Sequence, residues 1–155
     1  FASSAEGDYA VGGLPSVDGA KSVTVFAKFR NAASVPVRRW NVCYSAEKYR
    51  AGLAGCQIAL LASRDGSNWS PAGAPAAFAA DSNVSGYAPE ALPGLTVRVE
   101  ALAEFGAAVP PGGVFYLAWQ VALSAGEAAS EAQALGVDDV SVSPVLPGAC
   151  VLMLR

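Results

Sequence analysis

Histidine is absent from the sequence, and charged residues are scarce. Because histidine is the commonest general base and metal ligand, its absence excludes histidine-dependent catalytic triads and histidine-ligated metal sites. Charged residues make up 15% of the 155 residues, against about 25% in an average protein, which excludes disorder driven by charge. The net charge is −3 without any block of lysine or arginine, so nucleic acid is a poor partner.

The sequence also lacks a long hydrophobic run. A membrane-spanning helix needs about 18 or more consecutive apolar residues, and no such run exists, so no membrane span is predicted. The chain starts at Phe1 without a methionine, as expected of a mature form after signal cleavage or of an excised module. We expect an extracellular or cell-surface location, one domain over residues 1–143 and an apolar C-terminal tail over residues 144–155.

There are only three cysteines, Cys43, Cys56 and Cys150, and their spacing does not resemble a zinc site. Cys43 and Cys56 fall on consecutive predicted strands, where they could face each other across a hairpin. A disulfide there would close a loop of about 14 residues and contribute about 3 kcal/mol. The alternative is two buried free thiols, which behave as small apolar side chains.

What the sequence does contain is a series of short, valine-rich segments in which apolar and polar residues alternate between turn residues. Alternation with a period of two is typical of half-buried strands, and regular turn signals favour an all-β sandwich. We expect strands near residues 22–30, 38–46, 56–63, 95–103, 114–121 and 136–143, with an irregular surface connection over residues 70–93. The predicted core consists of Val25, Phe29, Trp40, Val42, Tyr44, Leu117, Trp119 and Val140.

One hairpin is predicted from local turn chemistry. Asp65 and Gly66 stand between two apolar stretches, and this pair of residues tolerates the positive φ angles of a tight turn. Trp69 follows the turn and would cover the returning strand.

Three stretches carry a resemblance to a known group of modules. Arg39–Arg50 resembles the L-x-V-x-Y-x-G-E-x-W-R strand of jelly-roll modules in large secreted bacterial proteins, and Phe115–Trp119 resembles their (F/Y)-x-L-R-W strand. Ala134–Val142 resembles their closing A-I-D-D-V-S-V strand, which is similar to the last strands of carbohydrate-binding modules and MAM adhesion domains. The resemblance implies a two-sheet antiparallel jelly-roll sandwich.

The same resemblance implies a calcium site. In similar modules an acidic residue at the position of Asp138 or Asp139 helps to hold a structural Ca²⁺ beside the first strand, where Glu6 and Asp8 would add oxygens. Calcium takes six to eight oxygen ligands. The alternative is that one of the two adjacent aspartates faces inward and accepts hydrogen bonds from backbone amides without an ion.

A sugar-binding site needs exposed aromatic rings, and the candidates in predicted loops are Trp69, Tyr87 and Tyr49. No enzyme activity is expected, because no serine, cysteine or lysine stands in a motif with a base, and no glycine-rich phosphate loop is present.

Two functions follow from these observations. A chain that is 53% hydrophobic and 15% charged must expose apolar surface, which usually marks a contact with a partner. The first function is therefore a non-catalytic structural module that associates with itself or with a neighbouring surface protein. The alternative, from the resemblance and the loop aromatics, is a carbohydrate-binding or adhesion module. We expect the apolar tail to dock either on its own sandwich or on an adjacent subunit.

Overall fold

The computed structural model describes residues 9–16, 20–84, 95–127 and 131–146, and within these ranges the chain forms strands and no helix. No helix long and apolar enough to cross a membrane is therefore present in the described ranges. The strands are β1 (Val11–Gly13), β2 (Ser22–Arg30), β3 (Val37–Arg50), β4 (Cys56–Ser63), β5 (Trp69–Pro71), β6 (Ala76–Phe78), β7 (Leu95–Val109), β8 (Val114–Leu123) and β9 (Ala134–Pro144).

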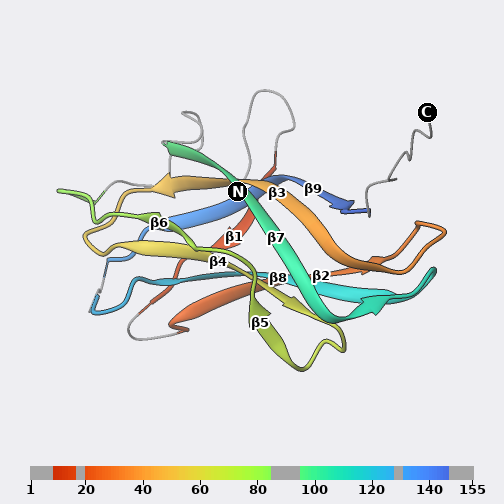
Figure 1. Cartoon of the computed structure of the whole chain (residues 1–155). Coiled ribbons are helices and arrows are strands. Elements are labelled where there is room, and N and C mark those ends of the chain that lie inside the picture. The colour runs from red at the N-terminus through yellow and green to blue at the C-terminus, as the bar shows by residue number, and fades with distance from the viewer. Residues whose placement is uncertain (1–8, 17–19, 85–94, 128–130, 147–155) are drawn as a thin grey trace, which may run out of the picture.

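The strands form two sheets that pack against each other (Figure 1). One sheet has the order β1-β9-β3-β7, and the other has the order β2-β8-β4-β5, with β6 also paired to β4. All pairings between these strands are antiparallel. The consecutive strands β4, β5 and β6 belong to the same sheet, and every other connection between successive strands carries the chain from one sheet to the other. This alternation is the jelly-roll arrangement, so the predicted fold class is confirmed.

The six expected strands are all present, and two of them, β2 and β4, have the expected bounds. The structure adds three strands of three residues each, β1, β5 and β6. β6 lies within the region 70–93 that was expected to be an irregular surface connection, and β5 overlaps its start. That expectation is wrong at β6, because Ala76 and Phe78 are buried.

The core lies between the sheets and is rich in aromatic side chains. Phe115 of β8 is its centre, with its ring centroid 4.5 Å from that of Trp40 and 5.4 Å from that of Phe29. Of the expected core residues, five are buried and two are partly buried; the buried ones are Trp40, Val42, Tyr44, Leu117 and Trp119, and the partly buried ones are Val25 and Phe29.

The eighth expected core residue, Val140, is 42% exposed, so this prediction is wrong. The reason is a β-bulge in β9. Cys43 pairs with Ser141 and Ser45 pairs with Asp138, so Asp139 and Val140 together stand opposite one residue of β3. Asp139 has a φ angle of 50°, and the extra residue interrupts the alternation on which the prediction rested.

Candidate functional site

β7 is a long strand with several exposed apolar side chains. It pairs with β3 on one side, and no strand pairs with its other side in the part of the chain that the structure describes. The exposed fractions of Leu95, Val97 and Leu102 are 47%, 36% and 42%. A long edge strand with exposed apolar side chains is a template for pairing with another chain. We call residues Leu95–Leu102 the β7 edge.

The register with β3 decides which side chains of the β7 edge share a face. Val97 and Val99 stand opposite Ala46 and Tyr44, so they lie on the face that looks toward the second sheet. Arg98, Glu100 and Leu102 alternate with them and lie on the outer face, opposite Ser45, Cys43 and Asn41 of β3. The edge therefore carries aliphatic side chains on one face and charges of both signs on the other.

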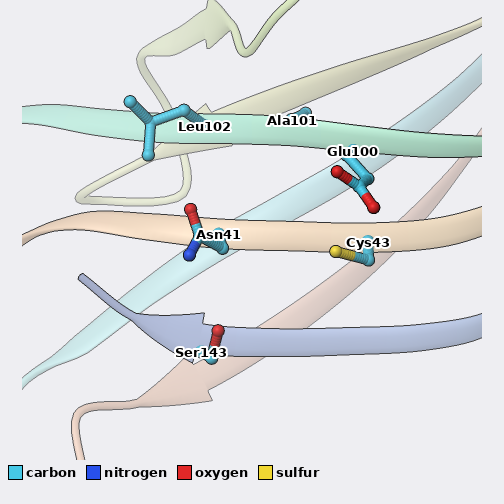
Figure 2. A pocket seen from close by; sticks show the side chains of 6 residues that line it. All are labelled: Asn41, Cys43, Glu100, Ala101, Leu102 and Ser143. Atoms are coloured by element: carbon cyan, nitrogen blue, oxygen red, sulfur yellow. The ribbon is translucent and has the colours of Figure 1, made fainter.

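A shallow hollow of about 430 Å³ adjoins the β7 edge on the outer face of the four-stranded sheet. Figure 2 shows that it spans β7, β3 and β9, and that the Glu100 carboxylate projects from β7 on the same side as the Cys43 thiol. The residues that line the hollow are Asn41, Cys43, Glu100, Ala101, Leu102 and Ser143. The hollow thus offers polar groups beside an exposed leucine.

A second apolar area lies on the outer face of the five-stranded sheet. Phe26 of β2 is 64% exposed, and its ring centroid lies 5.4 Å from that of half-buried Trp69 of β5. The strands β8 and β4 lie between β2 and β5. Ala118 of β8 stands opposite Phe26 and is fully buried. On the same face, the Lys28 ammonium lies 5.9 Å from the ring centroid of Tyr116. We call Phe26, Trp69 and Tyr116 the aromatic face.

The three aromatic residues that were predicted to bind sugar lie in different environments or outside the described residues. Trp69 lies on the aromatic face. Tyr49 is buried, and its hydroxyl donates a hydrogen bond of 2.5 Å to Glu47 Oε2, so the prediction of an exposed Tyr49 ring is wrong. Tyr87 lies outside the described residues. Phe26 was not among the predicted sugar-binding residues, although its position between Thr24 and Lys28 on the outward-facing side of an alternating strand indicates an exposed aromatic ring.

The adjacent aspartates lie at the bulge of β9. The backbone N–H of Asp139 donates to Asp138 Oδ1 at 2.7 Å, and Ser45 Oγ donates to Asp139 Oδ2 at 3.3 Å. The Arg98 guanidinium donates to the Asp139 carbonyl at 3.3 Å. Asp138 pairs with Ser45 on the outer face of the sheet, and Asp139 is exposed, so the expectation that one of them faces the core is wrong.

These contacts bear on the calcium prediction. Within the described residues, no group of three or more cysteine, aspartate and glutamate side chains is placed to hold a metal ion. Two carboxylates that already serve local hydrogen bonds beside an arginine are a poor donor set for an ion that takes six to eight oxygens. The prediction therefore depends on Glu6 and Asp8, which lie outside the described residues, and it stays a prediction.

The predicted disulfide does not form in the structure, where Cys43 and Cys56 are both free. Cys43 lies on β3 with its thiol in the outer hollow, whereas Cys56 lies on β4 in the opposite sheet and is fully buried. The expectation failed because β3 and β4, although consecutive, belong to different sheets and do not form a hairpin. Cys150 lies outside the described residues.

Different reactivity of the two thiols is expected. Iodoacetamide should alkylate Cys43 in the folded protein, whereas Cys56 should react only after denaturation, because burial removes access and raises the pKa of the Cys56 thiol. Peptide mass spectrometry after alkylation without reductant measures both sites separately. A disulfide-linked peptide pair, or equal labelling of both thiols in the folded state, would contradict the structure.

A polar cluster closes one end of the sandwich. Lys48 Nζ lies 2.6 Å from Asp81 Oδ1, and Asp81 Oδ2 accepts hydrogen bonds from Gln133 Nε2 at 2.9 Å and from the Gly52 N–H at 3.0 Å. Gln133 is fully buried and also donates to the Ala79 carbonyl. The cluster ties the segment after β6 to β3 and to the start of β9, which is a structural role that no sequence motif indicated.

Replacing Asp81 by asparagine is expected to lower the free energy of unfolding by about 1–2 kcal/mol near neutral pH, because charge-assisted hydrogen bonds are lost. Burial acts to raise the pKa of Asp81, but the hydrogen bonds from Lys48, Gln133 and Gly52 lower it by more. A lowered pKa contributes stability above the unfolded-state value of about 3.9, and this contribution disappears as the pH falls. Urea denaturation should therefore show the difference in unfolding free energy between wild type and variant shrinking as the pH falls below the unfolded-state pKa of about 3.9. A difference that does not depend on pH would contradict the assignment.

Neither a protein-family model nor a curated protein matches the sequence.

Proposed function

We propose that this protein is a non-catalytic structural module that assembles with copies of itself through the β7 edge, outside the cell or at its surface. The observation that carries the proposal is the exposure of Leu95, Val97 and Leu102 along a strand that has one partner within the described residues. The extracellular location rests on the resemblance to secreted jelly-roll modules.

The β7 edge also lacks the features by which proteins usually protect a free strand. Natural edge strands are kept short, bent by bulges, or carry proline, lysine or inward-pointing charges. β7 has 15 residues, and from Leu95 to Leu102 it contains no proline and no lysine. Its register with β3 is regular over this stretch, and its charges, Arg98 and Glu100, lie on the outer face only.

The proposal predicts that a lysine at Val97 weakens assembly. The ammonium would stand among aliphatic side chains at the interface, where it must be desolvated or excluded, so we expect the dissociation constant to rise at least about tenfold. Sedimentation velocity over a range of protein concentrations measures this change.

Leu53→Lys is the matched control for Val97→Lys. Leu53 is 52% exposed, and it lies in the connection between β3 and β4 rather than on β7. The control variant should assemble like the wild type. A wild-type protein that stays monomeric at all concentrations, or a Val97→Lys variant that assembles normally, contradicts the proposed function.

The second candidate function is carbohydrate binding at the aromatic face, favoured by the exposed Phe26 ring beside Trp69. Aromatic rings provide large apolar contact area at low entropic cost, and polar neighbours such as Lys28 add hydrogen-bond donors. Pull-down on a panel of insoluble polysaccharides, with Phe26→Ala as the variant, tests this function. It requires binding by the wild type and at least about tenfold weaker binding by the variant.

A further inference from the structure

We propose that two copies of the chain pair their β7 strands antiparallel around a two-fold axis at Val99, so that the two four-stranded sheets continue into one. This inference rests on the proposed function and adds to it the partner, the symmetry and the register. The observation that selects the register is the order of charges along the outer face of the β7 edge.

The geometry of antiparallel pairing limits the choices. Directly opposite residues on two antiparallel strands project from the same face of the sheet. If both copies keep the same face toward their second sheets, an inner-face residue must meet an inner-face residue. The two-fold axis therefore lies between two copies of the same residue that stand directly opposite each other. It cannot lie level with the midpoint between two successive residues of β7.

With the axis at Val99, opposite charges meet twice. Arg98 stands opposite the partner's Glu100, and by symmetry Glu100 stands opposite the partner's Arg98. On the other face, Val97 stands opposite the partner's Ala101, and the two Val99 side chains meet at the axis. Opposite charges directly across from each other and β-branched pairs both stabilise antiparallel strands.

Axes at Arg98, Glu100 and Ala101 are less favourable. An axis at Arg98 or at Glu100 places two like charges directly opposite each other, which destabilises the pairing. An axis at Ala101 pairs Arg98 with the partner's Glu104. Glu104, however, already forms an ion pair with Arg38, with 3.2 Å between Oε1 and Nε, and this register also extends the pairing to Phe105, which is buried in the core of its own chain.

The two-fold register makes a specific prediction about charge reversal. Arg98→Glu and Glu100→Arg each create two like-charge contacts per dimer, so each variant alone should dissociate at least about tenfold more readily than the wild type. An equimolar mixture of the two variants should instead form a heterodimer as stable as the wild-type dimer within about threefold, because both charge pairs are then opposite again.

Sedimentation velocity on each variant and on the mixture tests the register, with circular dichroism to verify that each variant folds. Mixing Arg98→Glu with Glu104→Arg is the matched control: with the axis at Val99 the heterodimer keeps one like-charge contact and should stay weaker than the wild-type dimer, whereas an axis at Ala101 predicts full rescue. Recovery to the stability of the wild-type dimer that occurs only in the first mixture supports the proposal. Single variants that assemble like the wild type, or the absence of recovery in the first mixture, overturn the proposed register. If Val97→Lys still weakens assembly in that case, the proposed function stands without this register.

Discussion

Replacing Trp119 by alanine is expected to lower the free energy of unfolding by about 3–5 kcal/mol, a large part of the total stability of a domain of this size. Trp119 is 3% exposed and lies at the centre of the five-stranded sheet, on β8 between β2 and β4. Its ring meets that of Tyr44 edge-on, with 6.1 Å between the centroids. Removing it leaves a cavity between the sheets that rigid strands cannot close. Urea denaturation followed by circular dichroism measures the loss.

Trp119→Phe is the control for this prediction. In the part of the chain that the structure describes, the Trp119 indole N–H is buried without a hydrogen-bond partner. Phenylalanine keeps most of the ring volume and removes this unsatisfied donor, so the loss should stay below about 1.5 kcal/mol. A loss below about 1 kcal/mol for Trp119→Ala would show that the indole does not fill the core.

Replacing Gly12 by valine is expected to lower the free energy of unfolding by about 2–3 kcal/mol by detaching β1 from β9. Gly12 pairs with Gly136, and a Cβ atom at Gly12 would lie 2.0 Å from the Leu135 carbonyl oxygen and 2.6 Å from the Gly136 Cα. Both contacts are with backbone, so no side-chain rotation can relieve them. The same denaturation experiment measures the effect.

Gly106→Val is the matched control for Gly12→Val. Gly106 also lies in a strand, but a Cβ atom there would meet nothing within 4 Å, so the stability should change by less than about 0.5 kcal/mol. Equal losses at both positions would mean that the cost comes from the side chain itself and not from the close approach of β1 to β9.

The sequence was sufficient to predict the long strands, because their side chains alternate between core and solvent. Val23, Ala27 and Phe29 of β2 are partly buried, whereas Phe26 is exposed. The short strands escaped prediction because three residues are too few to display a period. β6 is an example: Ala76 and Phe78 are buried, but they stand in a segment whose prolines and alanines indicate a loop.

Other failures arose where local pattern and tertiary arrangement differ. The bulge at Asp139 inserts one residue into β9, and no local signal marked it, so Val140 was placed in the core. Cys43 and Cys56 were paired on the assumption that neighbouring strands form a hairpin, whereas β3 and β4 lie in opposite sheets. The first error concerns the register between two paired strands and the second concerns which strands pair, and both properties depend on the whole chain.

The candidate site was less predictable than the fold for the same reason. Val97 lies on the inner face of an alternating strand, and its exposure follows from the position of β7 at the edge of its sheet, which the alternation does not reveal. The composition did predict that apolar surface would remain outside. It contained no information on whether that surface would be a sheet edge or a sheet face.

Hydrogen–deuterium exchange at two protein concentrations tests self-assembly through β7 most directly. In a dilute sample, where the chain is monomeric, the edge amides of Leu95–Leu102 that point away from β3 should exchange rapidly. In a concentrated, assembled sample they should become protected, whereas peptides that cover the aromatic face around Phe26 and Trp69 should exchange at the same rate in both samples. Exchange of the β7 amides that does not depend on concentration, or new protection at Phe26 and Trp69 instead, would contradict the account.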